Sequence, residues 1–223
     1  MSPRNDRGSA PMLVLASGSP RRRHVMSQLG LSFETVAPPA GLEPPWDGAE
    51  APVAFAERLA RMKAAAVGSL RPDAIIVAAD TVVVLDAEVL EKPRDAAHAG
   101  EMLTRLAGRE HMVHTGVAVQ SPDGVALAPA GGGRAVVSGV ESTAVRFRPL
   151  APAAIEAYVA TGEPLDKAGA YGIQGYGAAL VESVHGCYFN VMGFPVTRVL
   201  SLLDDLGWRY EFPGWLTPTD DLV

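Results

Sequence analysis

Short apolar runs alternate with amphipathic segments along most of the chain, and this pattern predicts alternating strands and helices. The run 12-MLVLAS-17 ends in Gly-Ser-Pro, as a buried strand does where it enters a turn. A helix is expected next, since Ser19 is a suitable N-cap, Pro20 suits the first helical position and Gly30 suits the end. Residues 32–37 have the composition of a second strand.

The segment 53–70 is predicted to be an amphipathic helix, because Phe55, Leu59 and Met62 recur along one side. Further strands and helices follow the same two kinds of pattern. The expected strands are 74–86, 111–120, 135–148 and 179–184, and the expected helices are 95–108, 151–161 and 195–207. Strands and helices alternate, with several adjacent strands in the middle, so the fold class is α/β or α+β.

Three segments are expected to lie outside this core. Residues 1–11 have the composition of a disordered leader and lack the apolar centre of a signal peptide. Residues 121–134 are interpreted as a flexible hairpin insertion, and 207–223 as a C-terminal appendage. The remaining part, 12–206, is long and apolar enough for one large domain or two small ones that share an interface.

Composition points to a soluble intracellular protein. No apolar run is long enough to span a bilayer, and the single cysteine, Cys187, excludes an internal disulfide and suits a reducing cytoplasm. The formal net charge is −6, so the surface as a whole should repel nucleic acid. The sequence therefore predicts a cytoplasmic protein with no membrane contact and no stable nucleic-acid binding.

Lysine is rare in this chain, which makes each lysine a candidate for a special role. The sequence has 16 arginines but only three lysines, Lys63, Lys92 and Lys167. A lysine supplies a compact point charge on a flexible stem, which an arginine does not. Chance explains the numbers equally well before the neighbours of each lysine are considered.

Several well-known site motifs are absent from the sequence. It contains no GxxxxGK[ST] phosphate loop, no HExxH, no CxxC pair and no GxSxG elbow. His111 and His114 are three residues apart on an expected strand, where they would face opposite sides. They are interpreted as ordinary polar positions rather than metal ligands.

The densest positive charge is the run Arg21-Arg22-Arg23 at the start of the first expected helix. One interpretation is a solvated surface patch. The other is a seat for a highly charged anion, since a helix N-terminus offers free N–H groups and arginine forks suit phosphate oxygens. Successive helical positions point in different directions, so about two of the three side chains could reach one ligand.

Asp80 lies at the centre of 74–86 and interrupts this apolar run. A buried charge is costly unless it is paired or functional. Asp80 is therefore either a strand-end residue that caps a turn, or a general base or metal ligand at the end of a central strand. Lys92, in 90-LEKPRD-95, could reach back over the following loop.

A third candidate for chemistry is the glycine-dense stretch 164-PLDKAGAYGIQG-175. Its glycines allow the backbone to approach a ligand closely, and it also carries Asp166 and Lys167. These two side chains could form an internal salt bridge or could contact a substrate, and the sequence favours neither.

Five stretches in this order, LASGSPRR, LARMKA, AADTVV, LEKP and PLDKAGAYGIQG, resemble the Maf family of nucleoside triphosphate pyrophosphatases. The resemblance runs from about Leu13 to Leu206. It implies an α/β fold, with a mixed elongated sheet, flanking helices and two lobes of one catalytic domain (12–206) around a nucleotide cleft, similar to inosine triphosphatase. The last stretch resembles the branch of the family that acts on dTTP and UTP.

The resemblance implies hydrolysis between the α- and β-phosphates of a nucleoside triphosphate, which gives a monophosphate and pyrophosphate. Asp80 would accept the proton of the attacking water. The residues assigned to the phosphates and to their developing charge are Ser17, Arg21, Arg22, Lys63 and Lys92. A divalent cation, Mg²⁺ or Mn²⁺, is expected as cofactor, and a homodimer is common in the family.

Base choice and metal binding are also assigned through the resemblance. The residues expected to tune the choice of base are Arg21, Thr81 and Gln174. The amide of Gln174 can both donate and accept, which matches the N3–H and O4 edge of uracil or thymine. Family members carry an Asp-Glu pair where this chain has 41-GLE-43, so Glu43 joins Asp80 as the candidate metal ligand and catalytic carboxylate.

Two other functions stay open at this point. One is a cell-division regulator that binds a partner or nucleic acid, in line with the family's association with septum inhibition. Such a binding module has no need for an acid like Asp80 beside a cationic phosphate seat. The other is the same hydrolase acting on purine or methylated guanine nucleotides, against which 171-YGIQG-175 is the argument.

Overall fold

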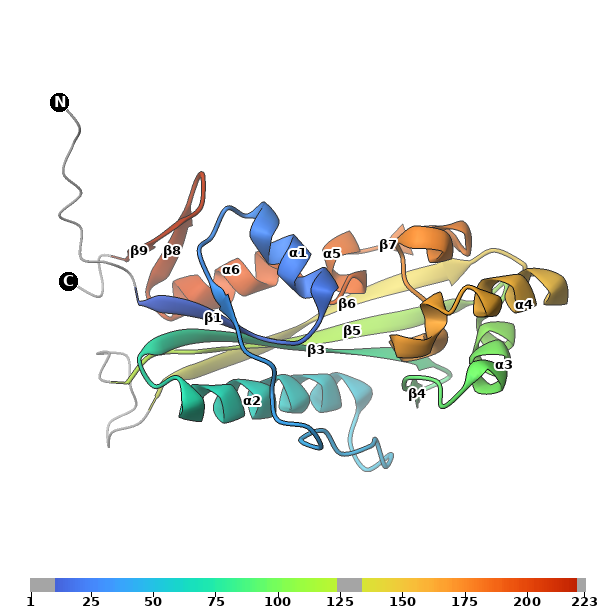
Figure 1. Cartoon of the computed structure of the whole chain (residues 1–223), viewed down its shortest axis with the longest axis horizontal. Coiled ribbons are helices and arrows are strands. Elements are labelled where there is room, and N and C mark those ends of the chain that lie inside the picture. The colour runs from blue at the N-terminus through green and yellow to red at the C-terminus, as the bar shows by residue number, and fades with distance from the viewer. Residues whose placement is uncertain (1–10, 124–133, 220–223) are drawn as a thin grey trace.

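The computed structural model describes residues 11–123 and 134–219, and its centre is an elongated, seven-stranded mixed sheet (Figure 1). The strands are Met12–Ala16 (β1), Glu34–Thr35 (β2), Ala74–Leu85 (β3), Glu88–Leu90 (β4), Glu110–Gln120 (β5), Val136–Phe147 (β6) and Val181–His185 (β7). Their order is β2-β1-β3-β5-β6-β7, and β4 also pairs with β3. β1 is parallel to β2 and β3, and the other pairs of this sheet are antiparallel. The predicted α/β class with a mixed sheet is confirmed.

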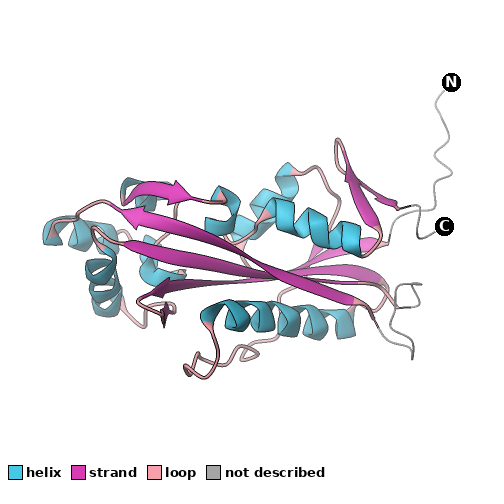
Figure 2. Cartoon of the chain, turned by 180° about the vertical axis from the view of Figure 1, so that it is seen from behind, coloured by secondary structure: helices cyan, strands magenta, loops and turns pink. Residues whose placement is uncertain are grey.

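Helices cover both faces and one end of the sheet (Figures 1 and 2). The α-helices are Pro20–Gln28 (α1), Pro52–Leu70 (α2), Ala96–Leu106 (α3), Pro152–Ala160 (α4), Tyr188–Val191 (α5) and Val196–Asp205 (α6). α2 lies along one face, α1 and α6 lie on the other, and α3 and α4 lie together at one end. Three short 3₁₀ helices, Glu163–Asp166 (η1), Ala168–Ala170 (η2) and Gly175–Ala179 (η3), follow α4.

The strand alternation decides which helix each side chain of the central strands meets. Val14 and Ile76 belong to the core cluster under α2, whereas Leu13 and Ile75 belong to the cluster under α1 and α6. Successive strand residues point to opposite faces. The same alternation directs Asp80 toward α2 and the next residue toward α1, so a site at this point can draw side chains from both faces.

β3 runs without a break through Asp80, so the prediction that Asp80 lies at a strand end is wrong. Asp80 keeps its place in the ladder, opposite Gly116 of β5. The sheet has a gap beside β3, because β1 ends opposite Ala78 and the pairing of β4 with β3 begins only at Val83. Within the described residues, 79–82 therefore have β5 on one side and no strand on the other. The lengths of β1 and β4 set this gap, and the composition of β3 does not reveal it.

The chain ends differ in part from the expected pattern. The second expected strand, 32–37, shortens to Glu34–Thr35. Residues 208–218 form a hairpin of two strands, Trp208–Glu211 (β8) and Trp215–Pro218 (β9), and the Tyr210 hydroxyl donates to the Leu29 carbonyl at 2.8 Å. The leader, except Pro11, and most of the 121–134 insertion lie outside the described residues.

Among the described helices, none combines the length and apolar character that crossing a membrane requires.

The start of α1 follows the sequence closely. Ser19 is the N-cap, its side chain accepts a hydrogen bond from the Arg22 N–H at 3.5 Å, and Pro20 is the first helical residue. The helix ends just before Gly30, which has a φ of +71°. The three arginines thus lie in the first turn of a real helix.

Candidate active site

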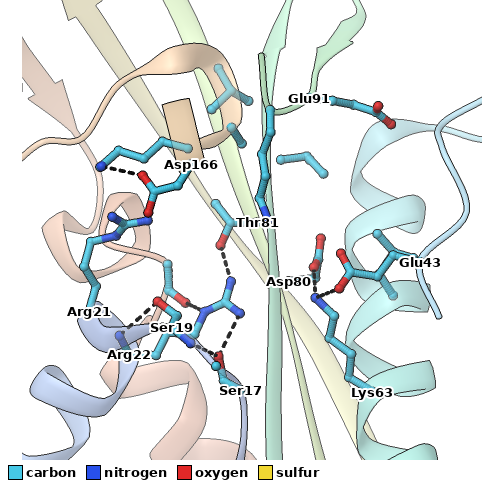
Figure 3. A pocket seen from close by; sticks show the side chains of 18 of the residues that line it. Ser17, Ser19, Arg21, Arg22, Glu43, Lys63, Asp80, Thr81, Glu91 and Asp166 are labelled. Carbon is cyan, nitrogen blue, oxygen red and sulfur yellow. Dashed lines mark hydrogen bonds and ion pairs between the residues drawn. The ribbon is translucent and has the colours of Figure 1, made fainter. Parts of the chain in front are cut away.

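A cavity of about 780 Å³ opens at the gap beside residues 79–82 of β3. The first turn of α1, the loop after β2, one side of α2, the end of β4 and the segment 166–174 line it. In Figure 3, β3 passes through the middle of this site, with labelled side chains on both sides of the strand. The residues predicted from the sequence all line the cavity: Ser17, Arg21, Arg22, Glu43, Lys63, Asp80, Thr81, Lys92 and Gln174.

On the α2 side of β3, the ammonium group of Lys63 lies between two carboxylates (Figure 3). Its Nζ donates to Asp80 Oδ1 and pairs with Glu43 Oε1 at 2.8 Å. The side chains of Lys63 and Asp80 are 8% and 9% exposed, whereas that of Glu43 is 48% exposed. The lysine and aspartate tolerate burial because each supplies the other's opposite charge. Glu43 faces the solvent side of the cavity.

The environment of Asp80 makes its carboxylate a better proton acceptor than an ordinary aspartate. Burial raises the pKa of the Asp80 carboxyl above its usual range, and the nearby charge of Glu43 acts in the same direction. Lys63 and Arg22 favour the charged form and oppose this shift without cancelling it. Raised pKa values of this kind are typical of carboxylates that take up protons during a reaction.

On the α1 side of β3, the hydrogen bonds of Arg22 connect α1 to β3. Its Nη1 donates to the Ala79 carbonyl oxygen at 2.7 Å, in the part of β3 that, among the described residues, pairs with a strand on one side only. Its Nε donates to the Gly193 carbonyl at 2.7 Å, and its Nη2 to Thr81 Oγ1 at 3.0 Å. A longer contact of 3.5 Å joins Nη1 to Ser17 Oγ. Four N–H groups of the guanidinium are thus engaged within the protein, which leaves one for the phosphate contact predicted for Arg22.

The hydroxyl of Thr81 is also engaged by neighbouring side chains. It accepts from Arg22, and its oxygen lies 3.0 Å from Thr115 Oγ1 on β5. Thr115 in turn donates to the carbonyl of Asn190 in α5 at 3.1 Å. The Thr81 proton therefore points at Thr115, so any influence of Thr81 on the choice of base acts through the position of Arg22. The sequence reasoning missed Thr115 and Asn190, which become neighbours of Thr81 only in the folded sheet.

Three of the predicted side chains remain open to the cavity. Arg21 is half-buried at the start of α1, and Lys92 and Gln174 are exposed. Figure 3 shows Arg21 beside Asp166, across the cavity from Lys63. The cavity thus has cationic side chains on several walls, as the binding of a polyanionic ligand requires.

Asp166 and Lys167 form the internal salt bridge that was one of the two alternatives. Lys167 Nζ lies 2.7 Å from Asp166 Oδ1 and also donates to the carbonyl oxygen of Glu163. The Lys167 side chain is 13% exposed and that of Asp166 is 71% exposed. Lys167 therefore holds the glycine-rich segment together, and Asp166 keeps a solvent-facing oxygen at the cavity.

Glu91 is a cavity residue that the sequence reasoning did not single out. Its Oε1 accepts a hydrogen bond from the Trp46 backbone N–H at 2.9 Å. Trp46 lies in the same loop as Glu43, so this bond attaches that loop to the end of β4. The available signal was its place in 90-LEKP-93, next to Lys92.

The two histidines of β5 make separate hydrogen bonds. His111 Nε2 lies 2.7 Å from the Tyr171 hydroxyl, and His114 Nδ1 lies 2.7 Å from Ser142 Oγ. Burial lowers the pKa of His111 to about 4, so its ring is neutral at physiological pH. Both side chains serve as buried polar contacts, and His111 supports Tyr171 at the edge of the cavity.

The carboxylates of the cavity suit a divalent cation that arrives with a phosphorylated ligand. Asp80 and Glu43 approach the same ammonium group, so their oxygens converge on one point. Over the described ranges, no group of three or more His, Cys, Asp or Glu side chains is gathered as a metal site. Mg²⁺ is commonly held by one or two carboxylates together with substrate phosphates and water. The residues present fit that type of site.

Comparison with known proteins agrees with this geometry. Residues 12–206 match the model of the family described as Maf-like protein. A dTTP/UTP pyrophosphatase from Moorella thermoacetica is 50% identical over 199 residues, which cover 87% of this chain and 95% of the relative. One from Symbiobacterium thermophilum is 46% identical over 196 residues, or 88% and 94% of the two chains.

Solved structures give a weaker likeness. A nucleoside-triphosphatase / dITP/XTP pyrophosphatase from Mycobacterium abscessus is 21% identical and overlaps with a TM-score of 0.34. The overlap covers 60% of this chain and 74% of the other.

Proposed function

The chain belongs to the Maf-like protein family, and from that premise we propose that it hydrolyses dTTP and UTP between the α- and β-phosphates. The products would be the nucleoside monophosphate and pyrophosphate. The observation that carries this proposal is the buried Lys63–Asp80 pair in a cavity that is also lined by Arg21 and Lys92. Relatives of 43–50% identity that carry the name dTTP/UTP pyrophosphatase support the same activity.

In the proposed reaction, Asp80 takes a proton from a water molecule. The water oxygen bonds to the α-phosphorus, and the bond to the bridging oxygen breaks, so pyrophosphate leaves with the electron pair. Lys63 keeps Asp80 in place and, near the reacting phosphate, balances the charge that develops. Displacements at phosphorus depend mainly on positioning and charge neutralisation, which is what this cavity offers.

The phosphate chain would lie between the first turn of α1 and the end of β4. The N-terminal end of α1, the hydroxyl of Ser17 and the side chain of Arg21 would bind it from one side, and Lys92 from the other. Asp80 and Glu43 would hold Mg²⁺ or Mn²⁺, which when bound would neutralise phosphate charge.

The base would lie against the segment that carries Gln174. This side chain is exposed at the cavity and its amide can pair with the N3–H and O4 edge of uracil and thymine. Arg21 and Thr81 would contribute to the choice of base from α1 and β3. We further propose that the enzyme acts in the cytoplasm, without stable nucleic-acid binding and as a homodimer, and keeps unwanted nucleotides out of nucleic acids.

The test is a panel of nucleoside triphosphates with Mg²⁺ or Mn²⁺ and with a chelator, in which pyrophosphate and monophosphate are measured together. Both products should form in equal amounts from dTTP and UTP, and the chelator should stop the reaction. Asp80→Asn should abolish turnover, whereas the surface substitution Asp123→Asn should leave it intact. Release of inorganic phosphate and diphosphate, or full activity in Asp80→Asn, would contradict the proposal.

A further inference from the structure

The turn that carries Gln174 is fastened at both ends by side chains from outside the turn. The residues of this turn are 172–177, which begin shortly after η2 and run into η3, and Gln174 is exposed at the cavity. Two side chains near the end of α4, Tyr158 and Glu163, supply the contacts. Neither was singled out from the sequence, and neither lines the cavity itself.

The carboxylate of Glu163 accepts hydrogen bonds from the backbone that follows Gln174. Its Oε2 accepts from the Tyr176 N–H at 3.0 Å, and its Oε1 accepts from the Gly177 N–H at 3.0 Å. The Tyr158 hydroxyl donates to the same Oε1 at 3.0 Å. One carboxylate thus receives three hydrogen bonds, two of them from consecutive N–H groups.

Tyr158 reaches the other end of the turn. Its hydroxyl oxygen accepts from the Gly172 N–H at 3.4 Å, so a single hydroxyl joins Glu163 to the start of the turn. Gly175, directly after Gln174, has a φ of +65°. A Cβ there would lie 2.6 Å from Glu163 Oε2, so the backbone touches the carboxylate. Gln174 is therefore held between two anchored points.

The charge of Glu163 strengthens these bonds. Burial acts to raise the pKa of the Glu163 carboxyl, but the hydrogen bonds from Tyr176, Gly177 and Tyr158 outweigh burial and lower it. The group is therefore ionised at neutral pH. Hydrogen bonds to a charged acceptor are about twice as strong as neutral ones.

The orientation of a glutamine amide decides which pyrimidine it prefers. Uracil and thymine present a donor at N3 and an acceptor at O4, whereas cytosine presents an acceptor at N3 and a donor at N4. A glutamine amide matches either pattern if it can turn over, because its oxygen and its NH₂ group then exchange places. Discrimination requires that the backbone and the amide of Gln174 be held in one orientation.

We infer that Glu163 is a positioning residue for base selectivity, which fixes the 172–177 turn so that Gln174 accepts uracil and thymine and rejects cytosine. This inference rests on the proposed function, in which Gln174 reads the base. Glu163 touches neither phosphate nor base, and acts only through the backbone of Tyr176 and Gly177 and through Tyr158.

The experiment compares kcat/KM for UTP and CTP in the wild type, Glu163→Gln and Tyr158→Phe. Glu163→Gln keeps the size of the side chain but turns an NH₂ group toward a backbone N–H. The UTP/CTP ratio should fall by about tenfold or more, the loss expected for removing a charge-assisted hydrogen bond. Tyr158→Phe should reduce the ratio in the same direction. Glu156→Gln, at an exposed position of α4, is the matched control and should leave the ratio unchanged.

Amide hydrogen exchange separates this role from general loss of structure. In Glu163→Gln, the amides of Tyr176 and Gly177 should exchange faster in the substrate-free protein, while those of the β3–β5 ladder stay protected. An unchanged UTP/CTP ratio in an active Glu163→Gln variant overturns the inference alone. A wild type that hydrolyses no pyrimidine triphosphate overturns the proposed function, and the inference with it.

Discussion

Asp80 and Gly116 are direct partners in the antiparallel pairing of β3 and β5, and α2 crosses the sheet at this point. A Cβ on Gly116 would lie 2.2 Å from the carbonyl oxygen of Ala56 in α2. The absence of a side chain at Gly116 therefore lets α2 approach closely, and this approach brings Lys63 to Asp80.

Gly116→Ala should weaken both the fold and the reaction. The helix has to move away from the sheet to admit the methyl group, at a cost of about 2–3 kcal/mol in the free energy of unfolding. Lys63 moves with it, so kcat should fall as well. Urea unfolding and steady-state kinetics measure the two effects.

The matched control is Gly100→Ala in α3, where a Cβ meets no heavy atom within 4 Å. This change should stabilise the protein by about 0.5–1 kcal/mol, because alanine favours a helix over glycine. Equal effects of the two substitutions would show that α2 does not depend on Gly116 for its approach.

The neighbouring residues Arg21 and Arg22 should respond differently to substitution by lysine. Arg22→Lys removes the fork that joins Ala79 and Gly193, so the free energy of unfolding should fall by about 2 kcal/mol. Arg21→Lys should change stability by about 0.5 kcal/mol at most, and should raise KM for UTP instead. Thermal unfolding and KM, measured for both variants, test this. A stable Arg22→Lys variant with a raised KM would assign Arg22 to the substrate.

The titration of Asp80 should reflect its burial. In the substrate-free and metal-free protein, a ¹³C NMR titration should show Asp80 losing its proton above the ordinary value of 3.8. Asp86 is the internal control, because the hydrogen bond from Arg109 lowers the pKa of its carboxyl below that value. Glu43→Gln should lower the Asp80 midpoint, since a like charge is removed. Coincident midpoints for Asp80 and Asp86 would be incompatible with a buried base.

The same shift has a consequence for stability. A carboxyl whose pKa is raised on folding stabilises the folded protein in its protonated form. Its contribution is fully present below pH 3.8 and is lost as the pH rises through the higher value of the folded state. Ionising Asp80 therefore lowers the stability of the folded protein, as is common where a residue serves a reaction.

Gln174→Glu should shift the enzyme from uracil toward cytosine. A carboxylate only accepts hydrogen bonds, so it loses the donor for O4 of uracil but can accept from the N4 amino group of cytosine. The ratio of kcat/KM for UTP and CTP should therefore fall, with Gln174→Met as a neutral control of similar length. An unchanged ratio in Gln174→Glu would remove Gln174 from base recognition.

The sequence predicts the elements well, because these depend on local signals, and Ser19 caps α1 as its residue type suggests. The nine candidate site residues, most of them assigned through the family resemblance, lie around one cavity. Asp80 was singled out because a carboxylate in an apolar run needs a partner. That partner is Lys63.

The sequence does not predict which of the candidate site residues make contacts that stabilise the fold. Arg22 contacts Gly193, 171 positions away, and such a contact depends on how α5 and α6 return to the sheet. The placement of Asp80 at a strand end was wrong for a similar reason, since the gap beside it depends on where the pairing of β1 and β4 with β3 stops. Glu163 gave no local signal, because its partners are backbone N–H groups whose positions only the folded turn defines.

The free edge of β3 at residues 79–82 also bears on how the protein avoids aggregation. An unpaired strand edge normally invites pairing with another chain. Here β1 and β4 flank the open stretch on both sides, and Arg22 already occupies the Ala79 carbonyl. The open stretch covers only residues 79–82, so it offers little edge with which another chain could pair. The two flanking strands and Arg22 thus protect this edge against pairing with another polypeptide.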